Sequence, residues 1–289
     1  MSKLLDFREF MGAGVDTLSW PPELDHLSAS SVGMLVRCPR QFQRRYLFHE
    51  KEKPGESLIV GTTMHSTLAW NYATKVSSGK DQPVADMVQY LNDEAIHAAI
   101  KEAGGIDNVR WDSDPETARS DSERITSAYY RQVVPRIQPV AVEEQFTLNF
   151  ESVRVPVIGY LDTRESERVL DVKSGRAVTR KVKPSWQLQG RLYSLATRLP
   201  TEYHSVSRAK TPGIVTALES EDMVIPVPSD GQVAEMARTL EMASATISYY
   251  WERYGMDQDW PTLGAIPDWS RNVLPCDLCG WREGCPAWS

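Results

Sequence analysis

Three segments with the alternation of β-strands follow one another in the middle of this chain of 289 residues, and they restrict the folds that it can adopt. Short polar turns separate these segments, and shorter strand-like segments follow after a helical pattern. This order predicts an α/β fold in which a central mixed sheet is flanked by helices. The expected strands are residues 140–151, 153–165, 168–175, 203–210, 213–220 and 222–228.

Helical spacing of apolar residues dominates the first half of the chain and returns twice after the first strands. A serine-rich cap signal opens the first helix, and Pro184 stands near the start of a later one. The tail is rich in tryptophan and cysteine and has little capacity for regular structure. The expected helices are residues 27–48, 56–76, 83–104, 122–137, 184–199 and 229–255.

Composition and charge exclude some classes of protein. No window approaches about eighteen uninterrupted apolar residues, and the N-terminus lacks the apolar core of a secretory signal, so we expect a cytoplasmic protein with no membrane partner. A net charge of −7 argues against a protein that coats nucleic acid, but it leaves room for a local basic channel. Residues 36–53 and 171–191 each carry six Lys or Arg. The first window also suits a solvated face, whereas the second adjoins two acids and favours attraction of phosphate.

Two acids and a lysine fall on neighbouring predicted strands. Side chains two residues apart share a strand face, so Asp171 and Lys173 project together while Val172 points to the opposite layer. A hairpin register brings Asp162 beside Asp171, where two carboxylates repel unless a cation lies between them. A hard divalent ion removes that repulsion, and Lys173 then orients a water or stabilises charge on a phosphate. An ordinary surface strand face is the alternative.

Three further residues are candidates for the same site. His65 lies on a predicted helix one turn after Gly61, which permits a close approach of the helix. Gln189 and Tyr193 are four residues apart and therefore share one face of the helix that follows the lysine strand. A structural histidine, a polar helix edge and a half-buried aromatic are the alternatives.

Four cysteines predict a metal site in a reducing compartment. Cys276, Cys279 and Cys285 follow the spacing C-x2-C-x5-C, and Cys38 stands far earlier in the chain. Three close thiolates leave a four-ligand site one ligand short, which Cys38 completes. Zinc and a [4Fe–4S] cluster both accept four thiolates, and the spacing does not choose between them.

Taken in order, "GTTMH", "GYLD", "LDVKSG" and "QLQGRLY" resemble the motifs of the RecB-like branch of the PD-(D/E)XK nuclease superfamily. The resemblance implies one nuclease domain over residues 28–289, with an N-terminal extension at 1–27, a helical insertion at about 80–135 and a cluster-binding tail at 270–289. It implies that Mn²⁺ or Mg²⁺ binds at this site, and the imidazole favours Mn²⁺. This chain has Asp rather than Glu before "VK", and the superfamily admits either. The implied metal ligands are His65, Asp162, Asp171 and the backbone carbonyl of Val172; Lys173 assists the attacking water, and Gln189 and Tyr193 line the DNA path and support the site. Glu144, on the preceding strand, is a further candidate acid.

The cysteine pattern carries a second resemblance. "LSASSVGMLVRCPRQF" is similar to the entry segment of iron–sulfur nucleases, which include the AddB recombination subunit and the CRISPR-associated Cas-four exonucleases. In those proteins one N-terminal cysteine joins three C-terminal ones around a [4Fe–4S] cluster. The resemblance therefore implies a structural cluster held by Cys38, Cys276, Cys279 and Cys285.

These observations lead us to expect a metal-dependent exonuclease that acts on single-stranded DNA or DNA ends in recombination, repair or end processing. A structure-specific endonuclease, a nuclease that processes CRISPR spacers and a non-catalytic DNA-binding module are the alternatives. No G-x-x-x-x-G-K-[ST] phosphate loop is present, so unwinding requires a helicase or recombination partner. Analogy suggests a bacterial cell and permits a phage origin. The expected DNA-binding residues are Arg176, Arg180, Lys181 and Lys183, with Trp186 stacking on bases.

Overall fold

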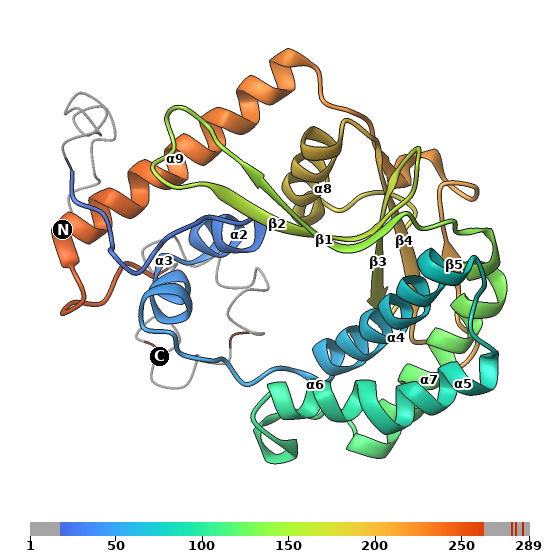
Figure 1. Ribbon diagram of the computed structural model, residues 1–289. Coiled ribbons are helices and arrows are strands. Elements are labelled where there is room, and N and C mark those ends of the chain that lie inside the picture. The colour runs from blue at the N-terminus through green and yellow to red at the C-terminus, as the bar shows by residue number, and fades with distance from the viewer. Residues whose placement is uncertain (1–17, 263–278, 280, 282–284, 286–289) are drawn as a thin grey trace. The chain divides into compact units, whose positions relative to one another are not determined.

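The computed structural model describes residues 18–262 together with Cys279, Trp281 and Cys285 (Figure 1). The described chain divides into two compact units. The first takes its described residues mainly from 18–52, 148–158 and 230–262, and the second comprises residues 53–147 and 159–229. The single domain expected over residues 28–289 stays a prediction. Within the described residues, no helix has the length and apolar character needed to cross a membrane.

A mixed sheet forms the centre of the second unit, as the sequence predicts. Its strand order is β1-β2-β3-β4-β5, and β6 also pairs with β4. β3 and β4 run parallel from the pair Val169↔Thr201 to Gly175↔Ser207, whereas β2 is antiparallel to β3, and β5 and β6 are antiparallel to β4. The strands are β1 (Ala141–Leu148), β2 (Val157–Arg164), β3 (Val169–Gly175), β4 (Thr201–Ser207), β5 (Ile214–Val215) and β6 (Val224–Ile225).

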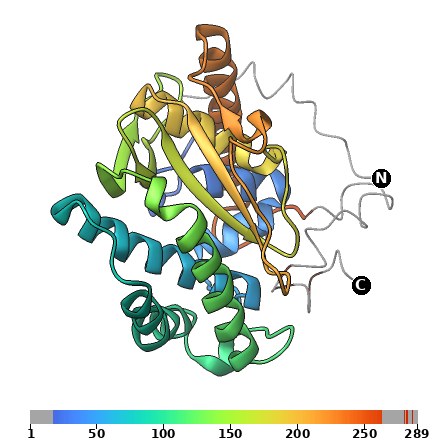
Figure 2. The same cartoon turned by 90° about the vertical axis from the view of Figure 1, so that its right-hand side faces the viewer.

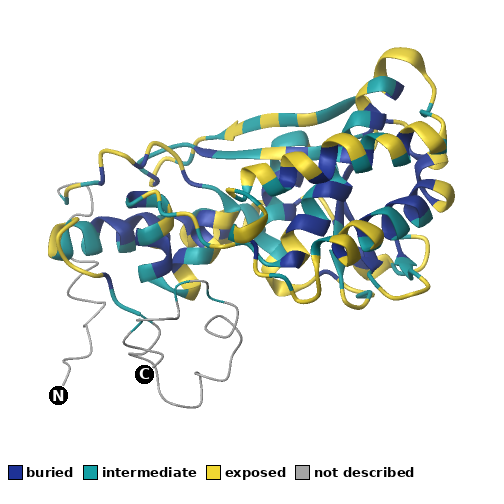
Figure 3. Cartoon of the chain, turned by 90° about the horizontal axis from the view of Figure 1, so that it is seen from below, coloured by how far each residue is buried: buried dark blue, intermediate teal, exposed yellow. Residues whose placement is uncertain are grey.

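Helices cover both faces of this sheet (Figures 1 and 2). On one face, α4 and α7 pack on Leu170 and Val172 of β3. On the other face, α8 packs on β3 and β4, and its Tyr193 contacts Val169. Buried residues accordingly line the inner sides of the helices, while exposed residues lie outside (Figure 3). The α-helices of this unit are α4 (Glu56–Ser78), α5 (Val84–Tyr90), α6 (Ile96–Glu102), α7 (Pro115–Gln132) and α8 (Pro184–Thr197), and a π-helical turn at Leu91–Ala95 joins α5 to α6.

The first unit is built mainly from α2 (Ala29–Arg37), α3 (Pro39–Phe42), a π-helical turn at Gln43–Leu47 and α9 (Asp230–Tyr254). Ser28 and Ser31 form a reciprocal capping box at the start of α2. The buried ring of Trp260 stacks on Phe42, with 5.9 Å between ring centroids. The side-chain amide of Gln43 forms hydrogen bonds with the backbone at residues 258 and 260. These bonds hold the segment after α9 against the π-helical turn that contains Gln43.

Several elements end earlier than the sequence pattern predicts, and each boundary has a physical reason. The helix expected over residues 27–48 breaks at Cys38, which adopts an extended conformation with φ −161° because it precedes Pro39. The two strands expected at 213–220 and 222–228 shrink to two residues each. A turn in which Thr216 bonds the Glu219 carboxylate ends the first, and Pro226 ends the second because it has no N–H for the ladder.

Strand β4 is buried along its whole length although most of its residues are polar. Its Glu202 carboxylate accepts a hydrogen bond from the Ala217 N–H at 2.9 Å and lies 2.8 Å from Nε2 of His204. Arg168 donates to the same carboxylate at 2.5 Å. Burial opposes ionisation of Glu202, but His204, the Ala217 N–H and Arg168 outweigh it and lower the pKa to about 2. The charge is therefore compensated from three directions.

We expect Glu202→Gln to lower the free energy of unfolding by about 3 kcal/mol at pH 7. The folded pKa lies below the unfolded value, so this stabilisation is present above the unfolded pKa and is lost as pH falls toward the folded one. The difference in the free energy of unfolding between the wild type and Glu202→Gln should fall at pH 3 to about half of its value at pH 7. Urea unfolding of both proteins at pH 7 and pH 3 measures it, with the exposed Glu102→Gln as control. An equal difference at pH 7 and pH 3 would contradict the lowered pKa of Glu202.

Candidate active site

The two acids lie where β2 and β3 separate. The paired register between these strands ends at Thr163↔Leu170, and Asp162 and Asp171 are the next residues on the two strands. The Glu165 N–H donates to the Arg168 carbonyl at 2.9 Å and closes the hairpin. Asp171 is completely buried, whereas the Asp162 side chain is about one-third exposed, at 32%. The hairpin thus brings two carboxylates to one point, as the alternation of the sequence predicts.

Helix α4 supplies His65 to Asp162. Nδ1 of His65 lies 3.1 Å from Oδ2 of Asp162. Gly61, one turn earlier, faces Oγ of Ser174 on β3, which lets the helix lie close to the strand. Burial favours the neutral imidazole, but the adjacent carboxylate of Asp162 and the negative charge of Asp171 outweigh it and raise the pKa of His65 to about 9. The same interaction, against the opposing effect of burial, lowers the pKa of Asp162.

Lys173 completes the group from β3. Its Nζ lies 2.9 Å from Oδ2 of Asp171 and donates to Oε1 of Gln189 at 3.1 Å. Nε2 of Gln189 donates in turn to the Tyr193 hydroxyl at 2.7 Å. The ammonium also lies 5.7 Å from the centroid of the Tyr203 ring on β4. One face of α8 and two strands therefore fix the position of the ammonium.

A glycine allows α8 to reach the sheet. A Cβ on Gly190 would lie 2.5 Å from Cδ1 of Ile225 and 3.0 Å from the Tyr203 ring. Such a contact requires a shift of the helix or of its neighbours. The absence of a side chain at residue 190 therefore places the adjacent Gln189 within reach of Lys173.

The acids have bonding capacity that their neighbours in the described residues do not fill. Both carboxylate oxygens of Asp171, and Oδ2 of Asp162, are buried without an aligned hydrogen bond. Lys173 and His65 provide charge but not a well-directed hydrogen bond. Burial and the negative charge of Asp162 outweigh Lys173 and His65, and they raise the pKa of Asp171 to about 6. Oxygens in this state fit a hard divalent cation.

As arranged, the side chains form two pairs rather than one closed ligand shell. His65 faces Asp162, and Lys173 faces Asp171. Within the described part of the chain, no three His, Cys, Asp or Glu side chains converge on one point as a metal site. The fit to a cation rests on the unfilled oxygens of the two acids. Glu144, the further acid, instead forms an ion pair with Arg164 at 2.6 Å.

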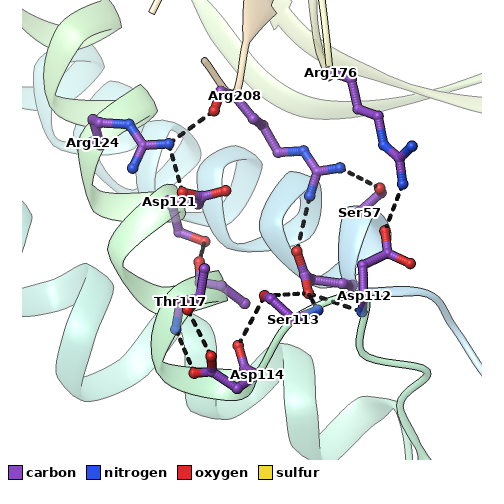
Figure 4. Close-up of polar contacts among 12 residues, drawn as sticks. Ser57, Asp112, Ser113, Asp114, Thr117, Asp121, Arg124, Arg176 and Arg208 are labelled. Carbon is purple, nitrogen blue, oxygen red and sulfur yellow. Dashed lines mark hydrogen bonds and ion pairs between the residues drawn. The ribbon is translucent and has the colours of Figure 1, made fainter. Parts of the chain in front are cut away.

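The expected DNA-binding residues gather in the loop from β3 into α8. Arg176, Arg180, Lys181 and Lys183 are all exposed there. Arg176 forms an ion pair with Asp112 at 3.1 Å (Figure 4). Trp186 packs on Tyr203, with 5.3 Å between ring centroids, and Nζ of Lys183 lies 5.0 Å from its ring. The loop thus presents a basic surface next to Lys173.

A buried ion pair, which sequence reasoning missed, anchors the start of α4 (Figure 4). Arg208, directly after β4, lies 3.3 Å from the Glu56 carboxylate and donates to Oγ of Ser57 at 2.8 Å. Glu56 also accepts the backbone N–H groups of Asp112 and Ser113 at 3.0 and 2.8 Å. The pair holds the helix that carries His65 against the end of the sheet. An acid at the start of α4 and an arginine directly after a strand were its only sequence signals.

The structure describes three of the four cysteines. Cys38, Cys279 and Cys285 are free and partly exposed, and Cys276 lies outside the described residues. Cys38 occupies the extended break between α2 and α3. The described residues form no site that fits a cluster, so the four-cysteine set stays a prediction.

Comparison with known proteins identifies the family. The sequence model of the PD-(D/E)XK nuclease superfamily matches residues 26–286. The crystal structure of a protein from Eubacterium rectale, named "Putative exonuclease", shares the fold with a TM-score of 0.54 over 94% of each chain, at 12% sequence identity. The crystal structure of SSO0001 gives a TM-score of 0.42 over 99% of this chain and 98% of its own, at 13% identity. No curated protein matches significantly.

The chain therefore belongs to the PD-(D/E)XK nuclease superfamily. Membership accounts for the mixed sheet flanked by helices. The RecB-like branch stays a prediction.

We expect Mn²⁺ at about 100 times its Kd to raise the Tm of the protein by about 5 °C, because a bound cation neutralises the buried carboxylates. Asp171→Asn should fold but lose this shift. Differential scanning calorimetry with Mn²⁺ and with chelator measures it, and Glu167→Gln in the exposed β2–β3 turn is the control. A full metal-dependent shift in Asp171→Asn would exclude Asp171 as a ligand.

Proposed function

We propose that the chain is a metal-dependent deoxyribonuclease that hydrolyses phosphodiester bonds in single-stranded DNA or at DNA ends. The observation that carries the proposal is the buried Asp171 carboxylate, which has unfilled oxygens beside Asp162 and Lys173. Membership of a nuclease superfamily supports hydrolysis. The name of the Eubacterium rectale protein supports an exonuclease over an endonuclease.

Each residue has a separate role in this proposal. Asp162, Asp171 and His65 hold Mn²⁺ or Mg²⁺, together with the carbonyl of Val172. A divalent ion at this place supplies Lewis-acid stabilisation of the charge that develops on the phosphate. Lys173 orients the attacking water or stabilises the same charge, and it depends on Gln189 for its position.

The surrounding residues bring the DNA to these groups. The exposed basic loop from Arg176 to Lys183 attracts the phosphate backbone, so binding should weaken as salt rises. Gln189 and Tyr193 border the path beside Lys173. A helicase or recombination protein is the proposed source of unwinding.

We expect purified protein with Mn²⁺ to release nucleotides from linear strands and to leave closed circular DNA intact. Strands labelled at either end report activity and direction, and Mg²⁺ should support a lower rate. Asp171→Ala should reduce the rate to background, and Lys173→Ala should lower kcat by about 100-fold. Glu167→Gln is the control. Cleavage of circular DNA would establish an endonuclease instead, and wild-type protein without activity on any DNA would overturn the proposal.

We also propose that Cys38, Cys276, Cys279 and Cys285 hold a structural [4Fe–4S] cluster. This proposal rests on the spacing of the cysteines in the sequence. The set would join distant parts of the chain and stabilise the fold, as cross-links of long loops do.

Anaerobically purified protein is expected to contain iron and inorganic sulfide in equal amounts, and Cys285→Ala should lose both and unfold at a lower temperature. Metal analysis and thermal unfolding measure this. Stoichiometric zinc in the wild type would assign the thiolates to zinc instead. Unchanged iron and Tm in Cys285→Ala would remove Cys285 from the site.

A further inference from the structure

Tyr160 is exposed in the middle of a strand of the sheet. Its exposed fraction is 58%, and among the large apolar side chains that are mostly exposed in the described residues it is the only aromatic one. Most tyrosines of this chain are instead half-buried or buried. Single exposed apolar residues are common on proteins, so exposure alone assigns no role.

The position of Tyr160 connects it to the candidate active site. It lies two residues before Asp162 on β2, so both side chains project from one face of the strand, with Cα atoms about 6.6 Å apart. Its neighbour Gly159 lies against Phe146, since a Cβ there would be 2.5 Å from the ring. Phe146 in turn packs on Tyr193 in the opposite layer. The Tyr160 ring therefore stands on the face that carries Asp162, outside the packed layer.

A polar side chain of the neighbouring strand holds the end of the ring. The Tyr160 hydroxyl donates to Oε1 of Gln145 on β1 at 3.2 Å. Gln145 and Thr147 are themselves exposed. Since no other mostly exposed large apolar residue lies on β1 or β2, the surroundings do not resemble the apolar core of a protein interface. A single restrained aromatic among polar groups suits a ligand that has a flat π-face and polar edges.

We propose that Tyr160 stacks on an unpaired nucleobase beside the scissile phosphate and that this contact selects single-stranded DNA or unpaired ends. The inference rests on the proposed nuclease function, and it adds the form of the substrate to it. Inside a duplex both faces of each base are stacked on neighbouring bases, so an unpaired base offers a face to the ring that an internal base pair does not.

Trp186, the stacking residue expected from the sequence, is less available for this role. Its ring packs on Tyr203, and Lys183 lies over it. Tyr160 offers a more exposed ring, and it shares a strand with one of the two acids.

Binding to DNA in Ca²⁺ and without Mn²⁺ or Mg²⁺ tests the proposal separately from cleavage. The probes are a fluorescent single-stranded oligonucleotide, the same strand with abasic sites, and its duplex. We expect Tyr160→Ala to weaken single-strand binding by about tenfold, and Tyr160→Phe to keep most of the affinity because it retains the ring. Tyr160→Leu should behave like alanine, since it is apolar but not aromatic. Leu218→Ala, at a residue that is 74% exposed in the same unit, is the matched control.

The loss should disappear on the abasic strand and on the duplex. Equal losses on all three probes would overturn base stacking in favour of a backbone contact, and so would equal losses for phenylalanine and alanine. Unchanged single-strand affinity in Tyr160→Ala, with wild-type cleavage intact, would overturn this inference alone. If the wild type neither binds nor cleaves any DNA, the proposed function fails together with it.

Discussion

The arrangement of the candidate site in the second unit depends on one unfavourable interaction, the burial of the Asp171 carboxylate beside Asp162. A carboxylate without aligned hydrogen bonds inside a protein is costly, and a second acid nearby adds repulsion. His65 and Lys173 lower this cost with positive charge but leave the oxygens unfilled. A fold optimised only for stability would replace this acid. In the function proposed above, a divalent cation supplies the compensation that these neighbours do not, and it polarises the phosphate of the substrate.

The rest of the unit holds these groups in place. β4 contacts three other strands and is buried throughout, so its polar side chains have to find partners inside the protein. Glu202 and His204 bind one another, and Arg208, directly after the strand, forms an ion pair with Glu56. One of these charged networks lies within the strand that supports Asp171, and the other lies directly after its end. They make the sheet rigid where the chemistry is proposed to occur.

The sequence predicts the sheet and the hairpin of acids well, because alternation in β3 and a short turn suffice to bring Asp162, Asp171 and Lys173 together. The approach of His65 follows only from helix packing, and the family resemblance predicted it. Periodicity did not predict the break at Cys38 or the shortened strands, since a proline or a local turn decides each of them. The sequence did not predict the ion pair of Glu56 and Arg208, because the two residues are about 150 positions apart in the chain. Tyr160 reads as an ordinary strand residue, and only the solvent exposure of its ring distinguishes it.

The tight fit at Gly190 has an evolutionary consequence. Even one methyl group at this residue would press on Ile225 and Tyr203, so the helix, the strand and the hairpin edge can change only together. Relatives with a larger residue here should carry a smaller one at the position of Ile225, or else have a helix displaced from the lysine. The distance between the Gln189 amide and the Lys173 ammonium thus depends on the volumes of the residues at 190, 203 and 225.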